Sequence, residues 1–140
     1  TVAFSMVGAE AIAGTAAYMA PEQARGLPVD KRADIWAFGG VLFEVLTARQ
    51  AFAGETVSDT IARILERPPD WSALPPTTPS NVRRVLTHCL EKDPNRRWRD
   101  IRDVRIELDE SDVIRHKLVK RIIAAFEAAD NNKTTTTKEA

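Results

Sequence analysis

Three observations predict a mainly α-helical fold for this sequence of 140 residues. Apolar residues recur with the 3.6-residue period of a helix in several segments. Another segment, residues 30–47, is apolar on all sides and free of proline, as in a helix buried within a domain. No stretch fits a β-strand better than it fits a helix. With 44% hydrophobic and 29% charged residues, the composition is that of one globular domain with a modest core.

The first 25 residues predict a loop followed by a short helix. Residues 1–14 are small, weakly apolar and interrupted by glycine, and they show no sustained period. Proline is suited to the first turn of a helix and glycine to the position after its end. Pro21 and Gly26 therefore predict a helix of roughly 21–25.

The central helix is predicted to run from Asp30 or Lys31 to Thr47, and the Asp30 side chain can cap its start. Two glycines within it, Gly39 and Gly40, cost about 2 kcal/mol of helix propensity. The close approach of another backbone explains them most easily. A carboxylate at Asp34, leading into a buried helix, needs hydrogen-bond donors around it. The alternative is a plain core helix without a functional role.

The next segments predict a capped helix and then an extended stretch. Thr56 and Asp59 have the spacing of a capping box, which predicts a helix over 57–66. Residues 67–79 hold five of the eight prolines. Proline orders such a stretch without hydrogen bonding, and Trp71 and Leu74 are expected to anchor it.

Three further helices are predicted after Ser80. Apolar residues at helical spacing follow Ser80 until Asp93-Pro94 stops the pattern. A second helix begins near Ile101, and a last amphipathic helix covers 111–130, either separate from the second or continuous with it. Lysines and arginines on its polar side allow binding to a membrane surface or a partner, or simple packing against its own domain. The tail over 131–140, with four consecutive threonines, is expected to be disordered.

Charge and cysteine content exclude several functions. Twenty basic residues balance twenty acidic ones, so nucleic acid is not an expected partner. One cysteine and two histidines predict neither a disulfide nor a metal site. No apolar run has the length of a membrane span, and no signal-peptide pattern opens the sequence. Membrane contact is therefore not expected, the reducing cytoplasm is the expected compartment, and a start at Thr1 suggests a fragment.

Three short motifs occur in order along the chain: Ala20-Pro21-Glu22, then Asp34-Ile35-Trp36-Ala37-Phe38-Gly39, then Asp93-Pro94-Asn95-Arg96-Arg97. They resemble the A-P-E, D-x-W-x-x-G and D-P-x-x-R motifs of the second half of a protein kinase catalytic domain. The resemblance covers about residues 1–110 and is closest to bacterial serine/threonine kinases of the membrane-receptor type. It implies the helical C-terminal lobe of the kinase fold with the N-terminal lobe absent, divided into an activation segment (1–25) and a helical core (30–110).

The resemblance also implies roles for individual residues. Glu22 and Arg97 match a glutamate and an arginine that form a structural ion pair, which would fasten the substrate-facing loop to the helical lobe. Asp34 matches an aspartate that accepts backbone N–H bonds from the catalytic loop and so supports that loop. Trp36 and Phe38 would belong to the core.

Residues 14–20 match the loop that receives the substrate residue next to the phosphoacceptor. Thr15 and Tyr18 are therefore expected to bind substrate. Thr15 also matches a threonine that bonds the catalytic aspartate in serine/threonine-specific kinases, so we expect it to be structural. Thr1 and Ser5 are possible phosphorylation sites that would order the loop.

No catalytic residue is identified in these 140 residues. Phosphoryl transfer needs a glycine-rich loop, a lysine on the phosphates, a catalytic loop and a magnesium-binding aspartate, and none of these matches the sequence. ATP and Mg²⁺ are therefore expected only for the parent enzyme, and the isolated chain is expected to be inactive. The expected partners are protein substrates, the missing N-terminal half of the domain and a second copy of the chain. The alternative is a non-enzymatic interaction module that docks proteins through the helix of 57–66 and the loop around Thr15.

Overall fold

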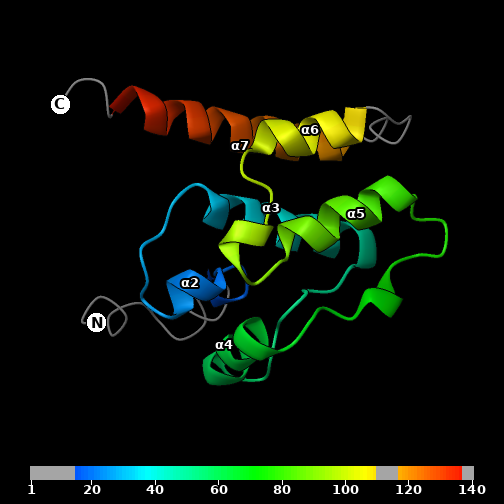
Figure 1. Ribbon diagram of the computed structural model, residues 1–140. Coiled ribbons are helices and arrows are strands. Elements are labelled where there is room, and N and C mark those ends of the chain that lie inside the picture. The colour runs from blue at the N-terminus through cyan, green and yellow to red at the C-terminus, as the bar shows by residue number, and fades with distance from the viewer. Residues whose placement is uncertain (1–14, 110–116, 137–140) are drawn as a thin grey trace.

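A computed structural model describes residues 15–109 and 117–136 of the chain, and every regular element in these ranges is helical. The α-helices are α2 (Pro21–Ala24), α3 (Arg32–Thr47), α4 (Val57–Glu66), α5 (Ser80–Cys89), α6 (Ile101–Asp109) and α7 (Lys117–Thr136), and two short 3₁₀ helices are η2 (Trp71–Ala73) and η3 (Pro94–Arg96). Helix α3 packs against α5 and α7, and α6 also packs against both of these. Helices α2 and α4 lie together at the other end of the molecule (Figure 1).

Helix α3 is the centre of the core, as its apolar sequence predicts. Trp36, Phe38 and Phe43 are almost completely buried. The N-cap residue is Lys31, whose side chain makes no cap bond, but the Asp30 carboxylate just before it accepts a hydrogen bond from the Arg32 N–H at 2.9 Å. The regular helix begins at Arg32, one or two residues later than predicted.

The two glycines of α3 differ in their surroundings. A Cβ atom added at Gly39 would lie 2.6 Å from the Cβ of Cys89, so helix α5 approaches α3 too closely there for any side chain. A Cβ added at Gly40 would make an ordinary 3.4 Å contact with the ring of Tyr18. The expected close approach of another backbone is therefore wrong in its agent: side chains of Cys89 and Leu90 crowd Gly39, and no close approach is required at Gly40.

Helix α4 has the predicted bounds and the predicted capping box. Thr56 Oγ1 accepts from the Asp59 N–H at 3.1 Å, and the Asp59 carboxylate accepts from the Thr56 N–H at 3.3 Å. In the proline-rich stretch that follows, Leu74 is buried and Trp71 is half-buried. Trp71 meets the ring of Phe43 edge-on, so the stretch is anchored as predicted.

The last two helices decide between two alternatives that the sequence left open and correct one expectation. Helix α6 ends at Asp109 and α7 packs against it, so α7 is a separate helix. Helix α7 continues through Thr136, and the prediction of disorder from residue 131 is wrong to that point. Once a helix is nucleated, each further residue adds a hydrogen bond, so a threonine run can extend it. Residues 111–116 and 137–140 lie outside the described residues.

Candidate functional site

Glu22 and Arg97, 75 positions apart in the sequence, form an ion pair in the structure. Arg97 Nη1 donates to Glu22 Oε1 at 2.7 Å, and Nη2 donates to Oε2 at 3.1 Å. The Arg97 side chain is 0% exposed and that of Glu22 is 7% exposed. Two parallel bonds between a guanidinium and a carboxylate, away from water, form one of the stronger polar contacts in proteins.

Arg97 also binds three backbone carbonyls. Nη1 donates to Arg32 O at 2.8 Å, Nε to Glu91 O at 3.0 Å and Nη2 to Lys92 O at 3.5 Å. Its guanidinium carbon lies 5.2 Å from the centre of the Trp36 ring. One side chain therefore joins α2, the first residue of α3 and the segment that precedes η3.

The local sequence places both partners of this ion pair. Pro21 starts α2, so Glu22 lies in the first turn of the helix, and the Ala20 N–H donates to the Gln23 side chain at 2.9 Å. Arg97 directly follows η3. The Asp93 carboxylate caps η3 by accepting from the Asn95 N–H at 2.9 Å.

The loop before α2 is anchored by buried alanine residues. Ala16, Ala17 and Ala20 are buried, whereas Thr15 is exposed. The Tyr18 N–H donates to Thr15 O at 3.3 Å and closes a turn. The loop therefore presents Thr15 outward while its alanines face the core.

Tyr18 is fixed by a carboxylate that the sequence analysis missed. Its hydroxyl donates to Glu44 of α3 and accepts a long, 3.5 Å bond from Gln50 Nε2. Burial and the bond to Glu44 raise the pKa of Tyr18 above its usual value. The available signal was an acidic residue inside an otherwise apolar helix, the same signal that drew attention to Asp34.

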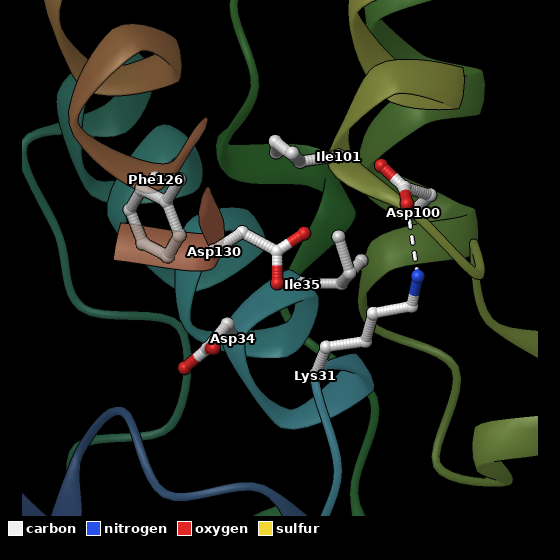
Figure 2. A pocket seen from close by; sticks show the side chains of 7 residues that line it. All are labelled: Lys31, Asp34, Ile35, Asp100, Ile101, Phe126 and Asp130. Carbon is white, nitrogen blue, oxygen red and sulfur yellow. Dashed lines mark hydrogen bonds and ion pairs between the residues drawn. The ribbon is translucent and has the colours of Figure 1, made fainter. Parts of the chain in front are cut away.

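Asp34 lies at the edge of a small hollow between α3, α6 and α7 (Figure 2). The hollow is lined by Lys31, Asp34, Ile35, Asp100, Ile101, Phe126 and Asp130. Lys31 Nζ donates to Asp100 at 2.9 Å across it. That bond raises the pKa of Lys31, and the Arg102 backbone N–H, together with Lys31, lowers the pKa of Asp100. The Asp34 carboxylate points away from this pair, and that of Asp130 points toward the middle of the hollow.

Lys92 is a second residue that sequence reasoning missed. Its ammonium group donates to the Ile64 carbonyl in the last turn of α4. The same group lies 4.9 Å from the centre of the Phe52 ring and 5.4 Å from that of Trp36. Burial, assisted by the charge of Arg25, lowers the pKa of Lys92 to about 8. Lys92 therefore connects the end of α4 to the aromatic core around α3.

The remaining sites considered from the sequence are two phosphorylation sites, a metal site and a membrane-spanning segment. Thr1 and Ser5 are outside the ranges that the structure describes. Within those ranges, no three histidine, cysteine or acidic side chains group in a way that would hold a metal ion. No helix in the same ranges combines the length and the apolar character needed to cross a membrane.

The helical fold and the buried ion pair between Glu22 and Arg97 together identify the class of protein. A helical lobe without strands in its described residues, in which a late arginine holds the glutamate that follows Ala20-Pro21, is the C-terminal lobe of the protein kinase fold. The protein kinase domain model matches residues 3–131, and the chain belongs to that family. The match extends past residue 110, where the sequence analysis ended the resemblance, and includes most of α7.

Bacterial relatives narrow the class to serine/threonine kinases. The chain is 36% identical over 105 residues to the serine/threonine-protein kinase PknB of Mycobacterium tuberculosis, which covers 74% of the chain and 17% of that protein. It is 32% identical over 106 residues to a probable serine/threonine-protein kinase of Streptomyces coelicolor, covering 75% of the chain and 16% of that protein. The chain thus spans about one sixth of the length of these relatives.

Proposed function

We propose that this chain is the helical C-terminal part of a serine/threonine protein kinase whose parent enzyme transfers the γ-phosphoryl group of ATP, with Mg²⁺, to protein substrates. The observation that carries the proposal is the buried, bidentate contact between Arg97 and Glu22. It fixes α2, and therefore the preceding loop, to the helical lobe at one point. Such positioning matters because phosphoryl transfer depends on orientation and electrostatics more than on covalent chemistry by the protein.

In this proposal the residues of the chain position the substrate and the catalytic loop, and they do not carry out phosphoryl transfer themselves. Thr15 and Tyr18 receive the substrate, and Asp34 holds the catalytic loop supplied by the missing N-terminal half of the domain. Residues 1–25 form the activation segment, with Thr1 and Ser5 as phosphorylation sites. Signalling in the cytoplasm, where ATP is available and Cys89 stays reduced, is the setting we assign to the parent.

The first test measures the isolated chain. We expect no micromolar binding of Mg-ATP by calorimetry and no transfer of labelled phosphate to a generic protein substrate. The reason is that no residue of the chain matches the lysine, the catalytic aspartate or the magnesium ligand of the family. Micromolar binding by a well-behaved monomer would refute the inactivity of this chain and point to a different active site.

The second test addresses the positioning role of Arg97. Arg97→Lys keeps the charge but loses the planar fork. Its neighbour Arg96 has a side chain that is 72% exposed, so Arg96→Lys is a matched control. We expect faster hydrogen exchange of the amides of residues 15–20 in Arg97→Lys only. Equal exchange in both variants would show that the ion pair does not order the loop.

A third test concerns the activation segment of the parent. Mass spectrometry of active full-length enzyme is expected to find phosphate at Thr1 or Ser5, with loss of activity when both are replaced by alanine. Phosphate only at Thr15, with Thr1 and Ser5 dispensable, would contradict the assignment.

A non-enzymatic interaction module is the second candidate, and one observation favours it. Helix α4 packs on α2 and leaves Val57, Ile61 and Leu65 only half-buried, which suits a docking role. Coding sequence upstream of Thr1 decides between the two. A glycine-rich loop and a catalytic loop encoded there favour the kinase, and their absence favours the module.

A further inference from the structure

The C-terminal end of helix α4 lacks two of its own hydrogen-bond donors. In an α-helix each carbonyl accepts from the N–H group four residues later. The donors for the carbonyls of Ile64 and Leu65 would be residues 68 and 69, which are both proline and carry no N–H. Ile64 is 0% exposed, so water does not readily take the place of the missing donor. This end of α4 therefore needs a donor from another part of the chain.

Lys92 supplies that donor. Its ammonium group donates to Ile64 O and lies 3.5 Å from Arg63 O. A cation at the C-terminal end of a helix is also stabilised by the helix dipole. The ring centres of Phe52 and Trp36 lie 4.9 and 5.4 Å from the same ammonium group. One charged group therefore fastens the end of α4 to the aromatic core.

The same surroundings make the Lys92 amine unusually reactive for a lysine. A helix end and two rings replace part of its water shell, which favours the neutral amine over the ammonium. Arg25, at the end of α2, adds a second positive charge nearby, and burial followed by this charge lowers the pKa of Lys92 to about 8. The neutral amine is the nucleophilic form. The side chain is half-buried, so a small molecule can still reach it.

We propose that Lys92 is an acylation site for small acyl phosphates, and that its acylation releases the C-terminal end of α4. The neutral amine attacks the acyl carbon, and a C–N bond forms. The C–O bond to the phosphate breaks, phosphate leaves with the electron pair, and the amine proton passes to water. The positive charge of Arg25 favours an anionic donor of this kind. The proposal holds whether or not the parent enzyme is a kinase.

Acylation removes what Lys92 contributes at the end of α4. The product is a neutral amide with a single N–H, so the charge-assisted bond to Ile64 O and the interaction with the helix dipole are both lost. The acyl group also adds atoms where the ammonium already meets a helix end and two rings. Helix α4 packs on α2, so the modification would loosen the part of the molecule next to the loop before α2.

The first experiment measures the reactivity of Lys92 in the whole chain, with Lys31 as the matched control. The Lys31 side chain is 48% exposed, but its ion pair with Asp100 raises its pKa. At pH 8 an ordinary lysine is less than about 1% neutral, whereas a pKa of about 8 leaves about half of Lys92 neutral. The chain is incubated with acetyl phosphate at pH 8, and mass spectrometry follows both sites. We expect Lys92 to react at least tenfold faster than Lys31.

The opposite outcome is equally clear. If exposure governed the reaction, Lys31 would react faster. Equal rates, or faster reaction of Lys31, would show that the rings and the carbonyls keep the Lys92 amine charged, and would overturn the proposal.

The second experiment measures the consequence for α4. Chain acetylated at Lys92 is separated by ion exchange, since it has lost one positive charge, and is compared with unmodified chain by hydrogen exchange. We expect the amides of residues 64–67 to exchange at least tenfold faster after acetylation, with those of α5 unchanged. Lys92→Gln should show the same pattern, and Lys31→Gln should not. Unchanged exchange at 64–67 in the acetylated chain, or equal loss of protection in α4 and α5, would refute a selective release of α4.

Discussion

Helices α2 and α7 are held to the same core by opposite means. Helix α2 has 4 residues, and a buried guanidinium that also binds three carbonyls holds it. Helix α7 has 20 residues and is attached by Ile123, an edge-on ring contact of Phe126, and an exposed ion pair. The length of a helix therefore does not measure how firmly it is fixed. A buried charge makes α2 obligatory, because losing the contact would leave that charge without a partner. The ion pair between Glu127 of α7 and Arg105 is exposed, so breaking it leaves no buried charge.

The largest effect is expected from breaking the contact that holds α2. Glu22→Gln or Arg97→Met removes one partner and leaves the other buried without compensation. We expect each variant to lose roughly 3–5 kcal/mol of the free energy of unfolding. Denaturant melts of both single variants and the double variant measure this.

The double variant checks that the loss belongs to the pair. Removing both charges leaves no stranded partner, so the double variant should lose less than the sum of the two single losses. Strict additivity would mean that Glu22 and Arg97 do not interact, and the contrast between α2 and α7 would then be lost.

The next largest effect is expected in α3, the central helix of the core. Gly39→Ala would place a methyl group 2.6 Å from the Cβ of Cys89. Overpacking of this kind costs about 1–3 kcal/mol, which exceeds the gain of up to about 1 kcal/mol in helix propensity. Gly40→Ala has room at 3.4 Å and should be neutral or slightly stabilising. Thermal melts that rank the two variants the other way would show that α5 does not constrain α3 at Gly39.

The sequence predicted the elements whose signals are local. The capping box at Thr56 and Asp59, the helical period after Ser80, and the apolar residues of α3 each lie within one segment. Each appears at the predicted place. The contact between Glu22 and Arg97 is not local. It was expected only because the family resemblance links two motifs 75 positions apart.

Residues whose roles depend on packing could not be predicted in the same way. Nothing around Lys92 in the sequence indicates that it reaches the end of α4 and two aromatic rings. Glu44 bonds Tyr18 across 26 positions, and no motif connects them. The end of α7 was misjudged because the threonine run has low helix propensity, whereas a helix that is already formed can continue through such residues.

A smaller effect is expected at Lys92, on the side of the molecule that holds α2 and α4. Burial lowers its pKa to about 8, whereas an unfolded lysine titrates near 10.4. Between these values the unfolded state binds more protons, so the free energy of unfolding should rise with pH from about 8 to 10.4. The contacts with Phe52 and Trp36 favour the charged form and oppose this trend. Melts in this pH range, with Lys92→Met as the control, decide: a fall with pH in the wild type alone would mean that the aromatic contacts outweigh burial.

The smallest effect is expected where α7 meets α6. The Arg105 side chain is 56% exposed, so water and salt screen its attraction to Glu127, and holding two long side chains together costs entropy. Arg105→Ala should therefore lose less than about 1 kcal/mol at low salt and almost nothing in 1 M salt. The loss caused by Arg97→Met should persist in the same salt, because its buried partner is poorly screened. If high salt abolished the Arg97 effect or left a large Arg105 effect, the two attachments would not differ in kind, and α7 would be fixed as firmly as α2.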